Sequence, residues 1–186
     1  MQTPTVLILI DLQQAIDDPS WGERNNPDAE QIAVRLLTHW REKGWPVIHV
    51  KHDSTEPQST YRPGQPGNHF KPEFLPLAGE TVIAKRTNSA FIGTPLELLL
   101  RANHQETLAI CGVITNNSVE ATVRNGANLG FTIYLAEDAC FTFGRNDWQG
   151  RKRTADEVHA LSLANLHGEY CTVLTADELI QTVEQV

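Results

Sequence analysis

The stretch CGVITNNSVEATVR, residues 111–124, joins the end of an apolar run to a short polar turn and the start of a helical pattern. A strand that passes through a tight turn into a helix is the repeating unit of parallel α/β sheets. The free N–H groups at the start of such a helix form a natural pocket for an anion or an oxyanion. Ser118 opens the predicted helix, which makes it a candidate nucleophile although no histidine stands beside it.

The same alternation of apolar runs and helical periodicity continues through the chain. Strands are predicted at residues 5–11, 46–52, 81–85, 106–113, 131–138 and 170–175. Helices are predicted at residues 28–44, 94–104, 118–130, 154–167 and 176–185. Uninterrupted apolar strands are typical of a sheet that helices cover on both faces. We therefore predict one domain over residues 1–186, a three-layer α/β/α sandwich around a Rossmann-like, six-stranded parallel sheet. The Pro- and Gly-rich segment 53–80 is long for a connection, which suggests a functional loop.

Charge and apolar content limit the classes of partner. The net charge of −8 argues against a nucleic-acid or anionic membrane surface, which would require a basic field. The apolar run VLILI at 6–10 is too short to cross a bilayer. No basic region precedes it and an aspartate follows it, so we do not expect a signal peptide. We expect a cytoplasmic protein that acts on a small molecule.

Three residues stand where predicted strands end or where a helix begins. Asp11 follows five apolar residues, Lys85 ends the third strand, and Ser118 follows the fourth. Ligands of open parallel sheets bind beyond these carboxyl ends. If Lys85 lies beside Asp11, it would hold the carboxylate ionised. The alternatives are a loop-capping Asp11, a solvated Lys85, and a Ser118 that only belongs to an Asn117–Glu120 capping box.

Metal and cofactor sites have little support in the sequence. His52, Asp53 and His69 lack the short spacing of a specific metal site, and no glycine-rich nucleotide motif is present. The three cysteines, Cys111, Cys140 and Cys171, lie in or beside apolar runs without a CxxC pair, and are expected to be small buried hydrophobes. We predict neither a metal nor a cofactor.

Taken together, several segments resemble the isochorismatase-like hydrolases, also called the cysteine hydrolase superfamily. They are LILIDLQ (7–13), VIAKRTNSAFIGTPLELLLR (82–101), CGVITNNSVEATVRNGANLG (111–130), EDACFTF (137–143) and the YRPGQPG loop (61–67). The resemblance implies a homodimer or homotetramer and a triad of aspartate, lysine and cysteine. The first two map onto Asp11 and Lys85, whereas Ser118 occupies the cysteine position.

The resemblance also implies other features of the site. A non-proline cis peptide is expected at Val113–Ile114, where together with Asn117 it would shape the oxyanion pocket. The metal ligands that nicotinamidases of this family carry after the second strand do not match VKHDS (50–54). The candidate substrate-binding residues are Gln13, Trp21, Tyr61, Arg62, Arg86 and Phe91. An arginine in the pocket would favour a carboxylate substrate, and an apolar lining would favour a neutral amide.

A serine in place of the cysteine changes the chemistry that the site can perform. An alcohol is far less acidic than a thiol, and serine hydrolases usually use a histidine base. The favoured hypothesis is hydrolysis of a vinyl ether, in which Asp11 protonates the enol carbon and water captures the cation. The alternatives are an amidase with Ser118 as nucleophile, a protein that binds without turnover, and a serine introduced to trap a substrate.

Overall fold

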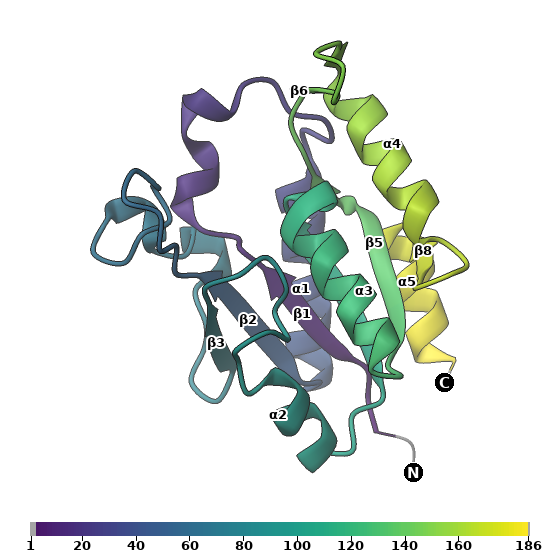
Figure 1. Cartoon of the computed structure of the whole chain (residues 1–186). Coiled ribbons are helices and arrows are strands. Elements are labelled where there is room, and N and C mark those ends of the chain that lie inside the picture. The colour runs from purple at the N-terminus through teal and green to yellow at the C-terminus, as the bar shows by residue number, and fades with distance from the viewer. Residues whose placement is uncertain (1–2, 186) are drawn as a thin grey trace.

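The computed structural model describes residues 3–185 and contains a six-stranded parallel sheet (Figure 1). Its strand order is β3-β2-β1-β4-β5-β8, and all neighbouring pairs are parallel. The strands are β1 (Val6–Ile10), β2 (Val47–His52), β3 (Thr81–Lys85), β4 (Thr107–Val113), β5 (Thr132–Phe141) and β8 (Thr172–Leu174). The predicted α/β fold is confirmed.

Helices cover both faces of the sheet, which explains why the strands are apolar throughout. They are α1 (Ala29–Lys43), α2 (Leu96–Ala102), α3 (Glu120–Asn128), α4 (Ala155–Leu166) and α5 (Ala176–Glu184). Helix α1 packs with α5 on one face, and α3 packs with α4 on the other (Figure 1). Every residue of β1 is buried between these two layers. None of the helices in residues 3–185 is both long and apolar enough to span a membrane.

Gly112 allows the two central strands, β1 and β4, to pair closely at their carboxyl ends. Its φ of +123° lies in a region that side-chain-bearing residues rarely adopt. A Cβ atom at this position would lie 2.2 Å from the carbonyl oxygen of Ile10. The end of β4 therefore requires glycine to pair closely with β1, just before the turn that carries Ser118.

The structure departs from the predicted elements in several places. The helix predicted at 118–130 begins instead with a single π-helical turn, Thr115–Val119, before α3. Strand β5 continues three residues beyond its predicted end at 138, and β8 is shorter than the predicted 170–175. A hairpin of β6 (Arg145–Asn146) and β7 (Lys152–Arg153) was not predicted, because its sequence is almost entirely polar.

The long segment 53–80 contains two short 3₁₀ turns, Pro66–Asn68 and Pro72–Phe74. The buried Asn68 amide donates to the carbonyl oxygens of His52 and Tyr61 at 3.0 and 2.7 Å. These bonds fasten the segment to the end of β2, so that Tyr61 is held over the carboxyl edge of the sheet. The three cysteines are buried and free, as predicted.

Candidate active site

The fold brings Asp11, Lys85 and Ser118 together at the carboxyl edge of the sheet. Lys85 Nζ lies 2.7 Å from Asp11 Oδ2 and donates a 3.1 Å hydrogen bond to Ser118 Oγ. The exposed fractions of the three residues are 4%, 1% and 7% in chain order. A buried ion pair is stable only where further hydrogen bonds satisfy its polar atoms, so the surroundings of Lys85 are decisive.

Two further groups face the Lys85 ammonium. The carbonyl oxygen of Thr87 accepts a hydrogen bond at 3.1 Å, and His52 Nδ1 lies 3.3 Å away. Burial, followed by the charge of Lys85, lowers the pKa of His52, and Asp11 and Asp53 only partly oppose this. His52 is therefore a neutral imidazole at neutral pH, and its Nδ1 can accept a hydrogen bond from Lys85.

Asp11 has an unusual backbone and one free carboxylate oxygen. Its φ of 53° is left-handed, which turns the chain sharply at the end of β1. The amide of Asp11 donates to Val50, and its carbonyl oxygen accepts from the amide of Gln13. Oδ2 is held by Lys85, whereas Oδ1 is buried without a hydrogen-bond partner among residues 3–185. An unsatisfied buried acceptor is costly, and such atoms concentrate at functional sites.

The turn that carries Ser118 is fixed by its neighbours. The peptide bond Val113–Ile114 is cis, as the resemblance implied. Thr115 Oγ1 lies 2.9 Å from His159 Nδ1, and Thr122 Oγ1 donates to the Ser118 carbonyl oxygen at 2.7 Å. Single π-helical turns are rare and often occur at functional sites. The turn thus presents Ser118 to the strand edge in one defined orientation.

A cavity of about 120 Å³ opens above the ion pair. Its walls are formed by Asp11, Trp21, His52, Ser59, Tyr61, Asn88, Val113, Ile114, Asn117 and Ser118. Trp21 and Tyr61 meet edge to face with 6.5 Å between ring centroids. Trp21 is held by a 2.9 Å hydrogen bond to the Ala15 carbonyl oxygen and by stacking on Phe143. The lining therefore combines aromatic and aliphatic side chains with hydroxyl and amide groups.

The structure places the predicted substrate-binding residues in different surroundings. Trp21 and Tyr61 line the cavity, whereas Gln13, Arg62, Arg86 and Phe91 are not among its lining residues. The buried Gln13 amide is bonded to backbone groups of His52 and Asn68, which gives it a structural role. Arg62 and Arg86 are exposed. Phe91 stacks on Phe131 in the core.

Sequence reasoning missed three residues of the cavity wall. His52 ends β2, so the strand-end rule that selected Asp11 and Lys85 also applies to it, although its place near Asp53 and His69 in the sequence pointed only to a metal ligand. Ser59 and Asn88 lie in loops and carry no comparable signal. Within residues 3–185, no three His, Cys, Asp or Glu side chains lie close enough together to hold a metal ion. A metal-free site remains a prediction.

Comparison with known proteins adds to this geometry. The isochorismatase domain matches residues 5–178. The chain is 43% identical over 180 residues to YrdC of Bacillus subtilis, an uncharacterised isochorismatase family protein. The alignment covers 97% of this chain and 96% of YrdC. The chain is also 31% identical over 140 residues to a streptothricin hydrolase of Streptomyces noursei. That alignment covers 74% of this chain and 49% of the enzyme.

A crystal structure of an isochorismatase family protein from Chromobacterium violaceum shares the fold over its whole length. It superimposes with a TM-score of 0.95 at 60% sequence identity, with complete coverage of both chains. The domain match, the relatives and the structural neighbour agree with one another and with the fold described above. The chain belongs to the isochorismatase family of hydrolases.

Proposed function

We propose that this protein hydrolyses a small metabolite of the vinyl-ether type through Asp11 and Lys85, without a covalent intermediate. The observation that carries the proposal is that the two oxygens of the Asp11 carboxyl group have different surroundings. Oδ2 is anchored by Lys85, while Oδ1 is buried without a partner in a residue that lines the cavity. That oxygen is free to carry a proton and to exchange it with substrate or water.

The proposed reaction uses Asp11 first as an acid and then as a base. Asp11 is a carboxylate beside Lys85 in the free protein, so its Oδ1 must first take up a proton from water. That proton then moves to the enol carbon, and the electron pair of the carbon–carbon double bond forms the new C–H bond. Water attacks the resulting oxocarbenium ion and returns a proton to Asp11. The hemiketal hydroxyl group then loses its proton and the leaving oxygen gains one from the Asp11 carboxyl group as the C–O bond breaks, which releases an alcohol and a carbonyl compound. Lys85 stays an ammonium throughout and keeps the carboxyl group in place.

Ser118 serves in this reaction as a positioning group. A serine nucleophile must pass its proton to a base. The hydrogen bond to Ser118 Oγ comes from Lys85, an ammonium paired with Asp11 that has no free electron pair. No histidine forms a hydrogen bond with Ser118 Oγ among the residues that the structure describes. The hydroxyl group can instead donate to a water molecule in the cavity.

The cavity limits the part of the substrate that reaches Asp11. A volume of about 120 Å³ equals roughly four water molecules, so the site holds a small reacting end. None of its lining residues is an arginine or a lysine. A buried carboxylate without a cationic partner would be strongly disfavoured. We infer that the reacting end of the substrate is uncharged.

Amide hydrolysis is the second candidate, and two observations favour it. The Asn88 and Asn117 side chains in the cavity wall suit a neutral amide or ureide, and Lys85 already contacts Ser118 Oγ. In this case Asp11 Oδ1 would accept the Ser118 proton as the hydroxyl oxygen attacks the carbonyl carbon.

A turnover screen with three variants tests the proposal. The parent chain, Asp11→Asn, Ser118→Ala and Ser118→Cys would be assayed with uncharged vinyl ethers, with isochorismate as a vinyl ether that carries a carboxylate, and with nicotinamide, small amides and ureides. Asp11→Asn should lower kcat by about 10²–10⁴, the usual contribution of an acid–base group. Ser118→Ala should retain most vinyl-ether turnover, and Ser118→Cys should bring no gain.

Other outcomes of the same screen would replace the proposal. Equal losses in Asp11→Asn and Ser118→Ala, with amide turnover increased by Ser118→Cys, would establish the amidase. Thermal stabilisation by a compound that neither the parent nor the variants convert would indicate a binding protein.

A further inference from the structure

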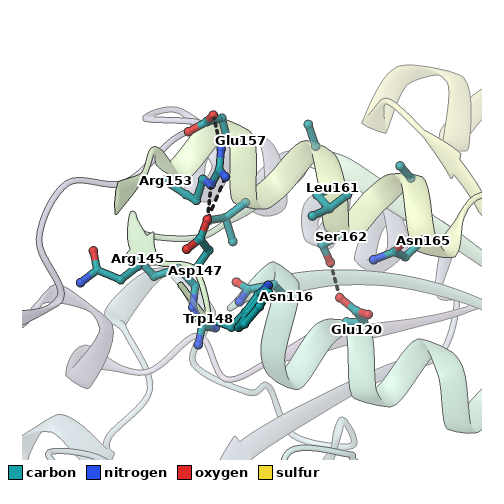
Figure 2. A pocket seen from close by; sticks show the side chains of 14 residues that line it. Asn116, Glu120, Arg145, Asp147, Trp148, Arg153, Glu157, Leu161, Ser162 and Asn165 are labelled. Carbon is teal, nitrogen blue, oxygen red and sulfur yellow. Dashed lines mark hydrogen bonds and ion pairs between the residues drawn. The ribbon is translucent and has the colours of Figure 1, made fainter. Parts of the chain in front are cut away.

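Two hollows adjoin the turn that carries Ser118, and they have no lining residue in common. The larger, of about 900 Å³, lies between the β6–β7 hairpin, α4 and the start of α3, where Ser162 donates a 2.6 Å hydrogen bond to Glu120 (Figure 2). The smaller is the active-site cavity. Of the two, only the cavity is lined by a residue with a buried, unsatisfied polar atom among residues 3–185, namely Asp11 Oδ1. Recognition of a small substrate is therefore expected from the groups around Asp11.

The ammonium group of Lys85 orients two side chains of the cavity wall at once. Asp11 Oδ2 lies 2.7 Å from Lys85 Nζ, and His52 Nδ1 lies 3.3 Å from it. An ammonium group can only donate hydrogen bonds, so Nδ1 must be the nitrogen of the neutral ring without a proton. The proton of His52 is then carried by Nε2, which makes this second ring nitrogen a hydrogen-bond donor.

His52 Nε2 has no hydrogen-bond partner in the part of the chain that the structure describes. It is also not one of the buried polar atoms without a partner, so it faces open space rather than packed side chains. The space that His52 lines is the active-site cavity. The ring of Tyr61 stands against the imidazole edge to face, at 5.7 Å between centroids and 71° between planes, and limits how far it can tilt. A free donor therefore stands at the cavity wall, in addition to the free acceptor of Asp11.

Buried side chains fix the backbone of His52 before any substrate binds. Gln13 Oε1 accepts a 2.6 Å hydrogen bond from the His52 amide, and Gln13 Nε2 donates to the His52 carbonyl oxygen at 3.1 Å. Asn68 donates to the same carbonyl oxygen at 3.0 Å. Both amide side chains are buried. A donor that is held in place beforehand loses little conformational entropy when it binds a ligand, so more of the hydrogen-bond energy goes into affinity.

We propose that His52 is a substrate-binding residue, in which the Nε2–H group donates a hydrogen bond to an oxygen atom of the uncharged reacting end. In a vinyl ether this oxygen is the one that leaves with the alcohol, and in an amide it is the carbonyl oxygen. Asp11 and His52 then contact the substrate from the ends of the neighbouring strands β1 and β2. The inference rests on the uncharged reacting end of the proposed function, but not on which of the two bonds is cleaved.

The test compares two small probes of nearly the same shape, acetamide and acetate, in a binding measurement that requires no turnover. Nitrogen NMR of the parent chain with labelled histidine reports which ring nitrogen of His52 carries the proton, and the His52 signals are those that disappear in His52→Gln. His52→Leu removes both ring nitrogens, whereas His52→Gln retains an N–H donor at the end of the side chain. His69→Leu is the matched control, because His69 is an exposed histidine of the long loop that does not line the cavity. Circular dichroism checks that each variant is folded.

In the parent chain the proton should lie on Nε2, and acetamide should shift the Nε2 signal, whereas acetate at the same concentration should not. Followed by the backbone amide signals of Asn117 and Ser118, the Kd for acetamide should rise about 10-fold in His52→Leu, as expected for the loss of one hydrogen bond. The Kd should rise less in His52→Gln and stay unchanged in His69→Leu.

A neutral His52 with its proton on Nδ1 overturns the proposal, as does an Nε2 signal that acetamide leaves in place. Both results come from the parent chain and so do not depend on the folding of a variant. Equal acetamide affinities of His52→Leu and the parent also overturn it, and so does tighter binding of acetate than of acetamide. Failure of the parent chain to convert any vinyl ether would contradict the proposed reaction alone, because the probe titrations would still show whether His52 donates to a neutral oxygen.

Discussion

Lys85 Nζ lies 2.7 Å from Asp11 Oδ2, although β2 separates their two strands in the sheet. The side chains of the pair are 0% and 6% exposed. Their attraction must therefore offset the loss of water around both charges, which leaves each one dependent on the other. The same ammonium contacts Ser118 and faces His52, so the pair connects the ends of three strands and the turn after β4.

Lys85→Met should cost about 3–5 kcal/mol of unfolding free energy, because it leaves the Asp11 carboxylate buried without its cation. The double variant Asp11→Asn/Lys85→Met should recover much of this loss, since it removes both charges. Both proteins should be inactive. Urea denaturation of the parent, the two single variants and the double variant would complete the thermodynamic cycle.

Lys51→Met provides the matched control on the neighbouring strand. Lys51 pairs with Asp53 at 3.1 Å, but the side chains of that pair are 23% and 24% exposed. Its loss should cost no more than about 1 kcal/mol. Equal losses in Lys51→Met and Lys85→Met would show that the Asp11–Lys85 pair has no special energetic role.

The fold and the centre of the site could be predicted because they follow from local patterns. Apolar runs separated by helical periodicity define a parallel sheet, and parallel strands bring their carboxyl ends to one edge. Asp11 and Lys85 each follow an apolar run directly, so their meeting required no knowledge of loops. The resemblance added the cis peptide at Val113–Ile114, which strand and helix patterns do not reveal.

The rim of the site could not be predicted in the same way, because loops set its composition. Arg62 and Asn88 both lie in irregular segments, yet only Asn88 reaches the cavity wall. Whether a loop side chain points inward depends on distant anchors, such as the bonds of Asn68 to the end of β2. The polar hairpin at residues 145–153 likewise has no alternating apolar face that would reveal its strands.

His52 should titrate below the ordinary value of 6.5. Burial is the main cause of its lowered pKa, followed by the charge of Lys85. Lys85→Met should therefore raise the pKa of His52, whereas Asp53→Asn should lower it further, since Asp53 acts in the opposite direction. Imidazole nitrogen NMR shifts followed against pH would report both changes.

The lowered pKa of His52 makes the unfolding free energy of the protein depend on pH. An unfolded chain would protonate His52 near pH 6.5, before the folded protein does. The stability that the neutral ring contributes is thus present above pH 6.5 and is lost as the pH falls through 6.5 toward the folded value. A folded-state pKa above 6.5, or one that Lys85→Met leaves unchanged, would refute the contact inferred between His52 and Lys85.

Glu80 should make the protein sensitive to acid, because it joins the end of the long loop to α1 and β2. Arg41 donates to its two carboxylate oxygens at 2.7 and 2.9 Å, and His49 Nε2 lies 2.8 Å from Oε2. Burial raises the pKa of Glu80, but hydrogen bonds from Arg41, the Leu77 amide and His49 outweigh it and lower the pKa from 4.5 to about 2. This difference in the pKa of Glu80 between the unfolded and the folded chain corresponds to at most roughly 3 kcal/mol of unfolding free energy at neutral pH.

A lowered carboxylate pKa stabilises the folded state above pH 4.5, and this contribution is lost as the pH falls toward 2. Glu80→Gln should lower the unfolding free energy by roughly 2 kcal/mol at pH 7, because it removes charge-assisted hydrogen bonds. It should also flatten the loss of stability between pH 4.5 and pH 2. Glu73→Gln is the control: this exposed residue of the same loop should change stability by less than about 0.5 kcal/mol. Thermal and urea unfolding at several pH values would separate the two variants. If the unfolding free energies of Glu80→Gln and the parent fell in parallel as the pH is lowered, Glu80 would not control the acid response.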